Sequence, residues 1–378
     1  MTDANQFNTE LPDSQGTQVS PVSPDQFDYQ AYADYEAGLL GRCRRFWEAD
    51  SGVAVYRRFR VPQCFTWMCR DMEASLAHQL GALAASMAYK ADIPNFLEPW
   101  YGIGILASAF GIDYMWPEHQ APVVPHAFSS IQEALDRAAV PVEETAIGRH
   151  TLGMIEYFVN ATHGRLPISL TDTQSPLNAL SFLIESNSFY IGFLDAPEAL
   201  GRMLDRLVPI QIDLVKRQLE LIGDAMVWPG HGFASSRAFS GLGMSDDIMT
   251  LLSSAQYRQF GVPGLVQCGR PFGGPAVHSC GDWANKAGVV RDIEGLVMVD
   301  AAFTHQTDPS PNDGTRFAEV FAGTGVVVNA RMVGNADTVI QCVRSLWRPG
   351  MKLIVVTYCQ DPQEQAEVYD AIHAMCEK

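Results

Sequence analysis

The chain has 378 residues and a formal net charge of −17, from 43 Asp and Glu against 26 Lys and Arg. This charge argues against nucleic acid and anionic membranes as partners, since both require basic surface. No run of about 18 apolar residues is present, so no membrane span is expected. The eight scattered cysteines, and an N-terminus without a secretory signal pattern, predict a cytoplasmic protein with free thiols.

Polar residues dominate positions 1 to about 28, which we expect to form a flexible arm, and a helix is predicted over 29–49. From about residue 60 onward, short apolar or β-branched runs alternate with longer helical patterns. The predicted strands are 63–68, 112–116, 166–170, 225–228, 276–280, 296–299, 326–329 and 353–357. Helices are predicted over 197–222, 247–259 and 337–346. Several strand runs are continuously apolar, which is typical of parallel strands buried on both faces.

This alternation predicts an α/β fold with a parallel sheet, and eight strands suggest a (β/α)8 TIM barrel with an N-terminal extension. The first two strands have the weakest patterns, so a doubly wound open sheet is the alternative. We expect residues 1–50 to form the arm and an N-terminal helix, and 51–378 to form one barrel domain. In a barrel the carboxyl ends of all strands meet on one face, where catalytic residues sit.

One imidazole and one thiol lie two residues apart at the end of the fifth predicted strand, at His278 and Cys280. Side chains two apart on a strand point to the same face, so both can address one metal ion. Cys359 follows the last predicted strand, and a barrel would bring it to the same face. A Cys2His set leaves the fourth position of zinc open for a reacting ligand. The simpler alternative is that these cysteines are small buried apolar residues.

Three further polar residues follow predicted strands and are candidate catalytic residues, namely Asp172, His231 and Asp300. Asp172 could instead cap the next helix, and His231 could be a loop residue without chemistry. Asp300 is a candidate fourth metal ligand or a hydrogen-bond partner of a ligand.

The chain resembles the uroporphyrinogen decarboxylase superfamily, specifically its zinc-dependent methyltransferase branch, over roughly residues 50–378. The resemblance rests on TDTQSPL at 171–177, on MSDDI at 244–248 leading to QYRQFGVP at 256–263, and on HSCG at 278–281 with Cys359. It implies a (β/α)8 barrel with Zn²⁺ held at its mouth by His278, Cys280 and Cys359. Such enzymes move methyl groups between a small molecule and the cobalt of a corrinoid carried by a separate protein.

The resemblance therefore implies a corrinoid-linked zinc methyltransferase. We expect O-demethylation of a small methylated donor, such as a methoxyarene, with zinc acting as a Lewis acid on the departing oxygen. The alternatives are methyl transfer from a methylcorrinoid to a thiol or tetrahydrofolate, and uroporphyrinogen decarboxylation. The decarboxylase branch uses an Arg-rich motif to hold eight carboxylates, whereas FTWMCRD at 65–71 offers one Arg. A non-enzymatic zinc barrel that docks a partner would normally have four protein ligands.

Aromatic and basic residues near the predicted strand ends suggest the substrate pocket. Trp67, Tyr101 and Trp228 are candidate walls for a planar ring, and Arg237 or Arg331 could hold a substrate carboxylate by a bidentate pair. Core packing explains such aromatics equally well. Barrels of this kind often pair, so a homodimer is compatible with the sequence, which identifies no interface.

Overall fold

A computed structural model describes residues 17–118, 120–126 and 128–376 of the chain. Its centre is a six-stranded sheet in the order β1-β6-β5-β4-β3-β2, and every pairing within it is parallel. The strands are β1 (Gly52–Arg57), β2 (Leu242–Ser245), β3 (Pro275–His278), β4 (Met298–Ala302), β5 (Val327–Met332) and β6 (Lys352–Thr357). Parallel order places the carboxyl ends of β2 to β6 at one edge of the sheet.

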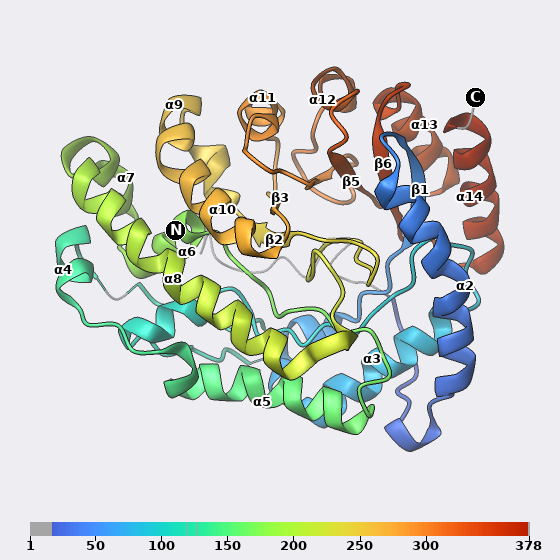
Figure 1. The fold of residues 1–378 in the computed structure, drawn as a ribbon, viewed down its shortest axis with the longest axis horizontal. Coiled ribbons are helices and arrows are strands. Elements are labelled where there is room, and N and C mark those ends of the chain that lie inside the picture. Colours follow the sequence, from blue (N-terminus) through green and yellow to red (C-terminus); the bar gives the residue numbers. More distant parts are fainter. Residues whose placement is uncertain (1–16, 119, 127, 377–378) are drawn as a thin grey trace.

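Helices surround this sheet (Figure 1). They are α2 (Tyr29–Glu48), α3 (Met72–Ser86), α4 (Ile131–Asp136), α5 (Ala146–Ala161), α6 (Pro176–Leu183), α7 (Ser186–Asp195), α8 (Pro197–Ile222), α9 (Ser254–Gln256), α10 (Val262–Gly269), α11 (Ala287–Arg291), α12 (Gly314–Phe321), α13 (Ala336–Leu346) and α14 (Pro362–Cys376). In Figure 1, α9, α11, α12 and α13 follow one another along the upper side, α10 lies below α9 beside β2, and α3, α5 and α8 lie on the lower side.

Single parallel bridges continue the strand arrangement beyond the named sheet. Leu97 pairs with Ile168, Ile168 pairs with Met226, and Gln174 pairs with Ser245 at the end of β2. Parallel strands with helices around them make a mixed α/β architecture that is consistent with a TIM-barrel-like fold.

Both faces of the sheet are buried in apolar clusters, and successive residues alternate between them. One cluster, which also packs against the helices, takes Val55, Val277, Val299, Val328 and Val355. The neighbouring residues of the same strands, Ala54, Ala276, Met298, Val327 and Ile354, belong to the other cluster. This two-sided burial is the physical reason that the strands are continuously apolar in sequence.

The structure confirms the four C-terminal strand predictions, which correspond to β3, β4, β5 and β6. The predictions over 166–170 and 225–228 reduce to isolated bridges at Ile168, Met226 and Trp228. The prediction over 63–68 is wrong, because this segment forms the 3-10 helices η2 (Pro62–Phe65) and η3 (Trp67–Arg70). The prediction over 112–116 retains one antiparallel bridge, from Met115 to Val123. Short apolar runs do not by themselves distinguish strands from helical turns.

Two strands, β1 and β2, were not predicted from the sequence. The helix predictions fare better, since α2, α8 and α13 match 29–49, 197–222 and 337–346 within three residues at each end. The predicted helix over 247–259 is broken into η7 (Asp247–Leu251), α9 and the π-helix η8 (Tyr257–Gly261). Ser253 forms a capping box with Gln256 and so starts a new helix inside this segment.

The first 16 residues of the expected flexible arm lie outside the described residues. Residues 17–28, in contrast, pack against the rest of the chain. The Thr17 amide donates to the Arg60 carbonyl at 2.8 Å, and the Val22 amide donates to the Ala77 carbonyl at 2.9 Å. Phe27 is buried in the main core. This part of the arm is thus attached to α3 and to the segment after β1.

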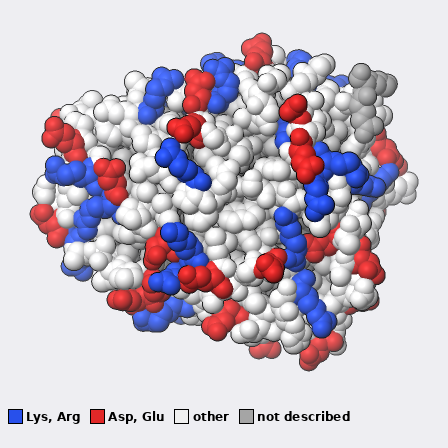
Figure 2. Space-filling view, in the orientation of Figure 1, with Lys and Arg blue, Asp and Glu red and all other residues white. Residues whose placement is uncertain are grey.

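Acidic and basic side chains are interspersed over the face drawn in Figure 2. The net charge of −17 is therefore not gathered into one field of single sign on that face. Within the described residues, no helix is both long and apolar enough to span a bilayer.

Gly81 in α3 provides a test of how the N-terminal segment packs. A Cβ at this position would lie 2.0 Å from the backbone carbonyl oxygen of Ser20, whereas a Cβ at Gly38 in α2 would have no atom within 4 Å. Alanine gains about 1 kcal/mol of helix propensity at either position. We expect Gly38→Ala to raise the free energy of unfolding, and Gly81→Ala to lower it by about 1–3 kcal/mol because the backbone at Ser20 must move. Chemical denaturation would measure both, and equal stabilisation by the two variants would contradict this packing.

Candidate functional site

Three polar side chains lie opposite one another across β3, β4 and β5. His278 pairs in register with Asp300, and Asp300 pairs with Asn329. Residues in register on adjacent parallel strands share a face of the sheet, so these three side chains meet on one face. Asp300 and Asn329 have no solvent exposure.

The buried carboxylate of Asp300 is surrounded by donors. Its Oδ2 contacts His278 Nδ1 and accepts from Arg331 Nε at 2.9 Å, and its Oδ1 accepts from the Asn329 amide. Burial opposes ionisation of this carboxyl, but Arg331 and His278 outweigh burial and lower its pKa to about 2. Asp300 is therefore ionised at neutral pH and orients the His278 ring.

His278 and Cys280 form a candidate metal site with Asp247. One ligand atom from each of the three residues lies within 4.8 Å of the other two. Cys280 Sγ lies 3.4 Å from His278 Nε2, and Asp247 Oδ1 lies 3.8 Å from the same nitrogen. Asp247 Oδ1 also accepts from the Cys280 amide at 2.7 Å.

The turn after Cys280 is held by hydrogen bonds on both sides. Gly281 has a φ of +72°, in the left-handed region that favours glycine. Its amide donates to Asp308 Oδ2 at 2.9 Å, and its carbonyl accepts from Asn312 Nδ2 at 3.0 Å. These contacts position the backbone that carries Cys280.

The donor set at this site matches the ligands that zinc takes in proteins, namely imidazole nitrogen, thiolate sulfur and carboxylate oxygen. Burial disfavours the charged form of His278, but Cys280 and Asp300 outweigh burial and hold its pKa well above the usual range. Because Asp300 faces Nδ1, Nε2 is the nitrogen that faces Cys280 and Asp247. A carboxylate on the second nitrogen is the usual partner of a histidine that binds a metal. The residues present therefore fit a zinc ion.

Cys359, the third ligand expected from the resemblance, does not belong to the cluster of described residues that gathers around His278. It is buried just after β6, and its carbonyl accepts from Arg57 Nε at 2.5 Å. Burial raises the pKa of the Cys359 thiol to about 11. Its role as a ligand stays a prediction.

A second group of titratable residues surrounds His231. Its Nδ1 lies 3.1 Å from Glu98 Oε1, which also lies 3.8 Å from Arg58 and accepts from the Gly232 amide at 3.3 Å. Glu98 is 5% exposed. Burial opposes its charge, but Arg58 and His231 outweigh burial and lower the pKa of Glu98 to about 2.

Asp172 lies on the other side of the His231 ring, with Oδ2 at 4.0 Å from Nε2. That oxygen accepts from Trp100 Nε1 at 3.4 Å, and Oδ1 accepts from Gln174 Nε2 at 2.9 Å. Gln174 in turn accepts from Asn178, whose Oδ1 accepts from the Ile248 amide at 3.2 Å. A hydrogen-bonded path thus leads from Asp172 to the backbone beside Asp247.

The predicted pocket residues have different surroundings. Tyr101 is buried, and its hydroxyl contacts His150 Nδ1; Trp228 stacks on Phe272; Trp67 is 44% exposed on η3. Arg331 binds Asp300 in the site described above. Arg237 binds Glu36 at 2.8 Å and donates to the backbone carbonyls of Asp224 and Arg165. Its guanidinium is therefore bound to groups outside the two histidine clusters. Substrate contacts of these residues stay predictions.

Asp247 is the first residue of the helix predicted over 247–259 and was not predicted as a metal ligand. Its place follows from β2, because Ser245 pairs with His278 and the Asp246 amide donates to the His278 carbonyl at 2.8 Å. Asp246 itself is buried, and burial raises its pKa to about 7 while Tyr257 donates to its Oδ2 at 3.0 Å. If the LGMS segment at 242–245 had been predicted as a strand, Asp247 would have been expected just after its end, next to His278.

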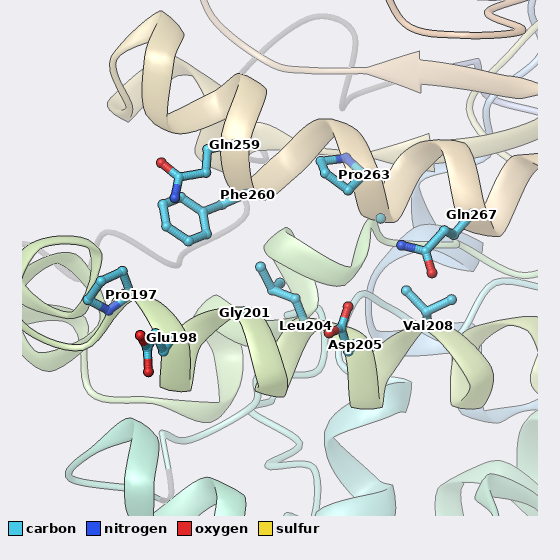
Figure 3. A pocket seen from close by; sticks show the side chains of 11 residues that line it. Pro197, Glu198, Gly201, Leu204, Asp205, Val208, Gln259, Phe260, Pro263 and Gln267 are labelled. Atoms are coloured by element: carbon cyan, nitrogen blue, oxygen red, sulfur yellow. The ribbon is translucent and has the colours of Figure 1, made fainter.

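A groove on the outside of the molecule is separate from this chemistry. It runs between α8 and α10, has a volume of about 450 Å³, and carries Glu198 and Asp205 beside Phe260 (Figure 3). Its lining contains no histidine or cysteine. The titratable clusters around His278 and His231 are therefore the stronger candidates for catalysis.

The sequence matches no protein-family model and no curated protein. Among solved structures, a methyltransferase from Methanosarcina mazei has a similar fold, with a TM-score of 0.61 and 16% sequence identity. The match covers 89% of this chain and 98% of that one. At this level of identity the likeness shows a shared fold.

The low pKa of Glu98 predicts how stability depends on pH. Its ordinary value of 4.5 falls to about 2 in the folded chain, so unfolding takes up a proton below about pH 5. This carboxylate therefore stabilises the fold above its unfolded pKa, by on the order of 3 kcal/mol, and the contribution is lost as pH falls from about 4.5 toward 2. We expect the difference in free energy of unfolding between the wild type and Glu98→Gln to shrink over this range in urea titrations. If the difference in free energy of unfolding between the two proteins stayed constant from pH 5 to pH 2, the low pKa of Glu98 would be contradicted.

Proposed function

We propose that this protein is a zinc-dependent methyltransferase that moves a methyl group from a small methylated donor, such as a methoxyarene, to the cobalt of a corrinoid held by a separate protein. The proposal includes a closed (β/α)8 barrel with the site at its mouth. The observation that carries it is the convergence of His278, Cys280 and Asp247 at neighbouring strand ends, with Asp300 behind the imidazole. The shared fold with a methyltransferase supports the same reading.

We assign His278 Nε2 and Cys280 Sγ as zinc ligands. The geometry favours Asp247 as the third ligand, whereas the sequence resemblance favours Cys359. Either set has three protein ligands and leaves a position for a reacting molecule, as catalytic zinc sites do. When bound, zinc would supply a Lewis acid that stabilises negative charge on the heteroatom from which the methyl leaves.

The chain's own residues prepare this site. Asp300 accepts from His278 Nδ1 and so keeps Nε2 as the ligating atom, and Arg331 keeps Asp300 ionised. Asp172 and His231 belong to a second titratable group with Glu98 and are our candidates for proton transfer to the leaving group. The arrangement requires no residue to act as a covalent nucleophile.

Metal analysis of the purified protein tests the ligand assignment. We expect about one zinc per chain in the wild type, and its loss in His278→Ala and Cys280→Ser, because a site that keeps only two protein ligands binds zinc far more weakly. Asp247→Asn and Cys359→Ser separate the two candidates for the third ligand, since the true ligand variant loses metal. Cys342→Ser is the matched control, because Cys342 Sγ donates to the Phe303 carbonyl and lies outside the metal cluster.

A wild-type protein that binds no zinc and keeps full activity would contradict the proposal. Full zinc retention by both Asp247→Asn and Cys359→Ser would restrict the protein ligands to His278 and Cys280 and would contradict a three-ligand site.

The direction of methyl transfer is tested with free cobalamins. We expect cob(I)alamin and a methoxyarene to give the methylcobalamin spectrum in the presence of the enzyme, at a rate that falls at least about 100-fold in Cys280→Ser, the magnitude expected for loss of the activating metal. Demethylation of methylcobalamin by a thiol, without reaction of any ether or amine, would assign the reverse direction. Release of carbon dioxide from uroporphyrinogen would replace the proposal with decarboxylation.

A further inference from the structure

We propose that Glu98 is a positioning residue that holds a proton on His231 Nδ1 and thereby presents Nε2 to the substrate as the proton-transfer atom. The role in catalysis rests on the proposed methyl transfer, but the arrangement of the side chains does not. Among the described residues, Glu98 lies outside the metal cluster.

Glu98 has the properties of a permanent acceptor. It is 5% exposed, and Arg58 and His231 lower its pKa to about 2 against the effect of burial. Its backbone is also fixed, because Gln79 Oε1 accepts from the Glu98 amide at 2.7 Å and Gln79 Nε2 donates to the Glu98 carbonyl at 3.0 Å. An ionised carboxylate can only accept hydrogen bonds, so a nitrogen facing it at 3.1 Å must carry the proton.

The surroundings of the His231 ring offer Nδ1 little besides the Glu98 carboxylate. Its Nδ1 is buried and, within the described residues, makes no hydrogen bond of good geometry, the contact with Glu98 included; Glu98 Oε1, at 3.1 Å, is nevertheless the carboxylate oxygen that this nitrogen faces. Phe65 and Trp100 lie beside the ring, with centroids 5.6 Å and 6.5 Å from that of the imidazole. With the proton on Nε2 instead, the Nδ1 lone pair would face the Glu98 carboxylate with no proton between the two acceptors, which favours the tautomer with the proton on Nδ1.

The opposite nitrogen is left for a ligand. Nε2 lies 4.0 Å from Asp172 Oδ2, beyond hydrogen-bond distance. Asp172 is itself held by Trp100 Nε1 and Gln174 Nε2, so its carboxylate is oriented toward the ring without closing on it. A heteroatom of the substrate placed to the side of this 4.0 Å gap, at the apex of a triangle with the two atoms, could lie within hydrogen-bond distance of both Nε2 and Asp172 Oδ2.

This arrangement suits the release of an ether oxygen. In the proposed reaction a cob(I)alamin on its carrier protein would supply the electron pair that takes up the methyl group, and the carbon–oxygen bond would break with its electron pair going to the oxygen. Protonated His231 donates the Nε2 proton to that oxygen and gives the free hydroxyl compound. The ring is then neutral with its remaining proton on Nδ1, the tautomer that Glu98 holds, and solvent returns a proton to Nε2.

The simpler view is that Glu98 and Arg58 form a buried ion pair that only stabilises the fold. The two views differ in the state of the imidazole. A purely structural pair would leave the tautomer of His231 unspecified and would affect activity only through stability.

The test combines nitrogen-15 NMR of histidine side chains with kinetics of methyl transfer. The His231 signals are assigned by their loss in His231→Asn, and the tautomer is read from the chemical shifts of the two ring nitrogens. We expect wild-type His231 to be protonated on Nδ1, and Glu98→Gln to shift the population toward the Nε2-protonated tautomer. The same variant should lower kcat by about 10- to 100-fold with KM changed less than about twofold, in the lower range expected for general acid–base catalysis.

Glu36→Gln is the matched control, because Glu36 is also buried and paired with an arginine, Arg237. It should change neither the His231 signals nor kcat. If Glu98→Gln fails to fold, Asp172→Asn is the second variant, which should keep the proton on Nδ1 while it lowers kcat.

A wild-type ring protonated on Nε2, or a Glu98→Gln protein with unchanged tautomer and kcat, would overturn the proposal. The NMR result is independent of the reaction. Failure of methyl transfer with an Nδ1-protonated ring would therefore reject the proposed function and leave the positioning role of Glu98 standing.

Discussion

Asp300 is a charged group without solvent exposure in the interior of a parallel sheet. The desolvation of an unpaired carboxylate there would cost several kcal/mol, so the neighbouring strands must supply partners. β3 supplies His278, and β5 supplies both Asn329 and Arg331. One carboxylate therefore couples the register of β3, β4 and β5 with the orientation of the His278 ring and the placement of the Arg331 charge. A shift of either neighbouring strand by one residue would leave that charge unpaired.

The two histidine clusters share one physical device. In each, a buried carboxylate is kept ionised by an arginine and faces Nδ1 of an imidazole, as Asp300 does for His278 and Glu98 does for His231. The groups that face Nε2 differ. His278 Nε2 faces a thiol and a carboxylate, which suit a metal, whereas His231 Nε2 faces only a carboxylate at 4.0 Å. The same pairing of a carboxylate with Nδ1 thus orients both rings, with donors suited to a metal at His278 and a carboxylate alone at His231.

The sequence predicted that His278 and Cys280 lie close together, and their ligand atoms are 3.4 Å apart, but β3 ends at His278 and the turn that follows places Cys280. Asp300 was expected after a strand and lies within β4, in register with His278. Asp247 was missed because β2 is four residues long and contains a glycine, so it has little apolar signal. The contact of Glu98 with His231 was not predicted, because the backbone near Glu98 makes a single strand bridge, at Leu97. Both residues depend on contacts distant in sequence, between β2 and β3 and between Glu98 and Arg58, which local patterns do not encode. Local patterns also gave no sign that Asp247 lies near His278, so the third ligand was taken from the resemblance, which implies Cys359. The structure groups Asp247 with His278 instead.

The arginines near the two histidines bear on which substrate the site can take. A substrate with many carboxylates requires several cations directed at it. Arg331 already binds Asp300, and Arg58 lies next to Glu98, so each of these positive charges is matched by a buried negative one. Arg57 is fully buried and donates to the carbonyls of Cys359 and Arg58. The charge at this end of the sheet is thus largely compensated within the protein, which favours a neutral or singly charged substrate over a polycarboxylate and supports methyl transfer over porphyrinogen decarboxylation.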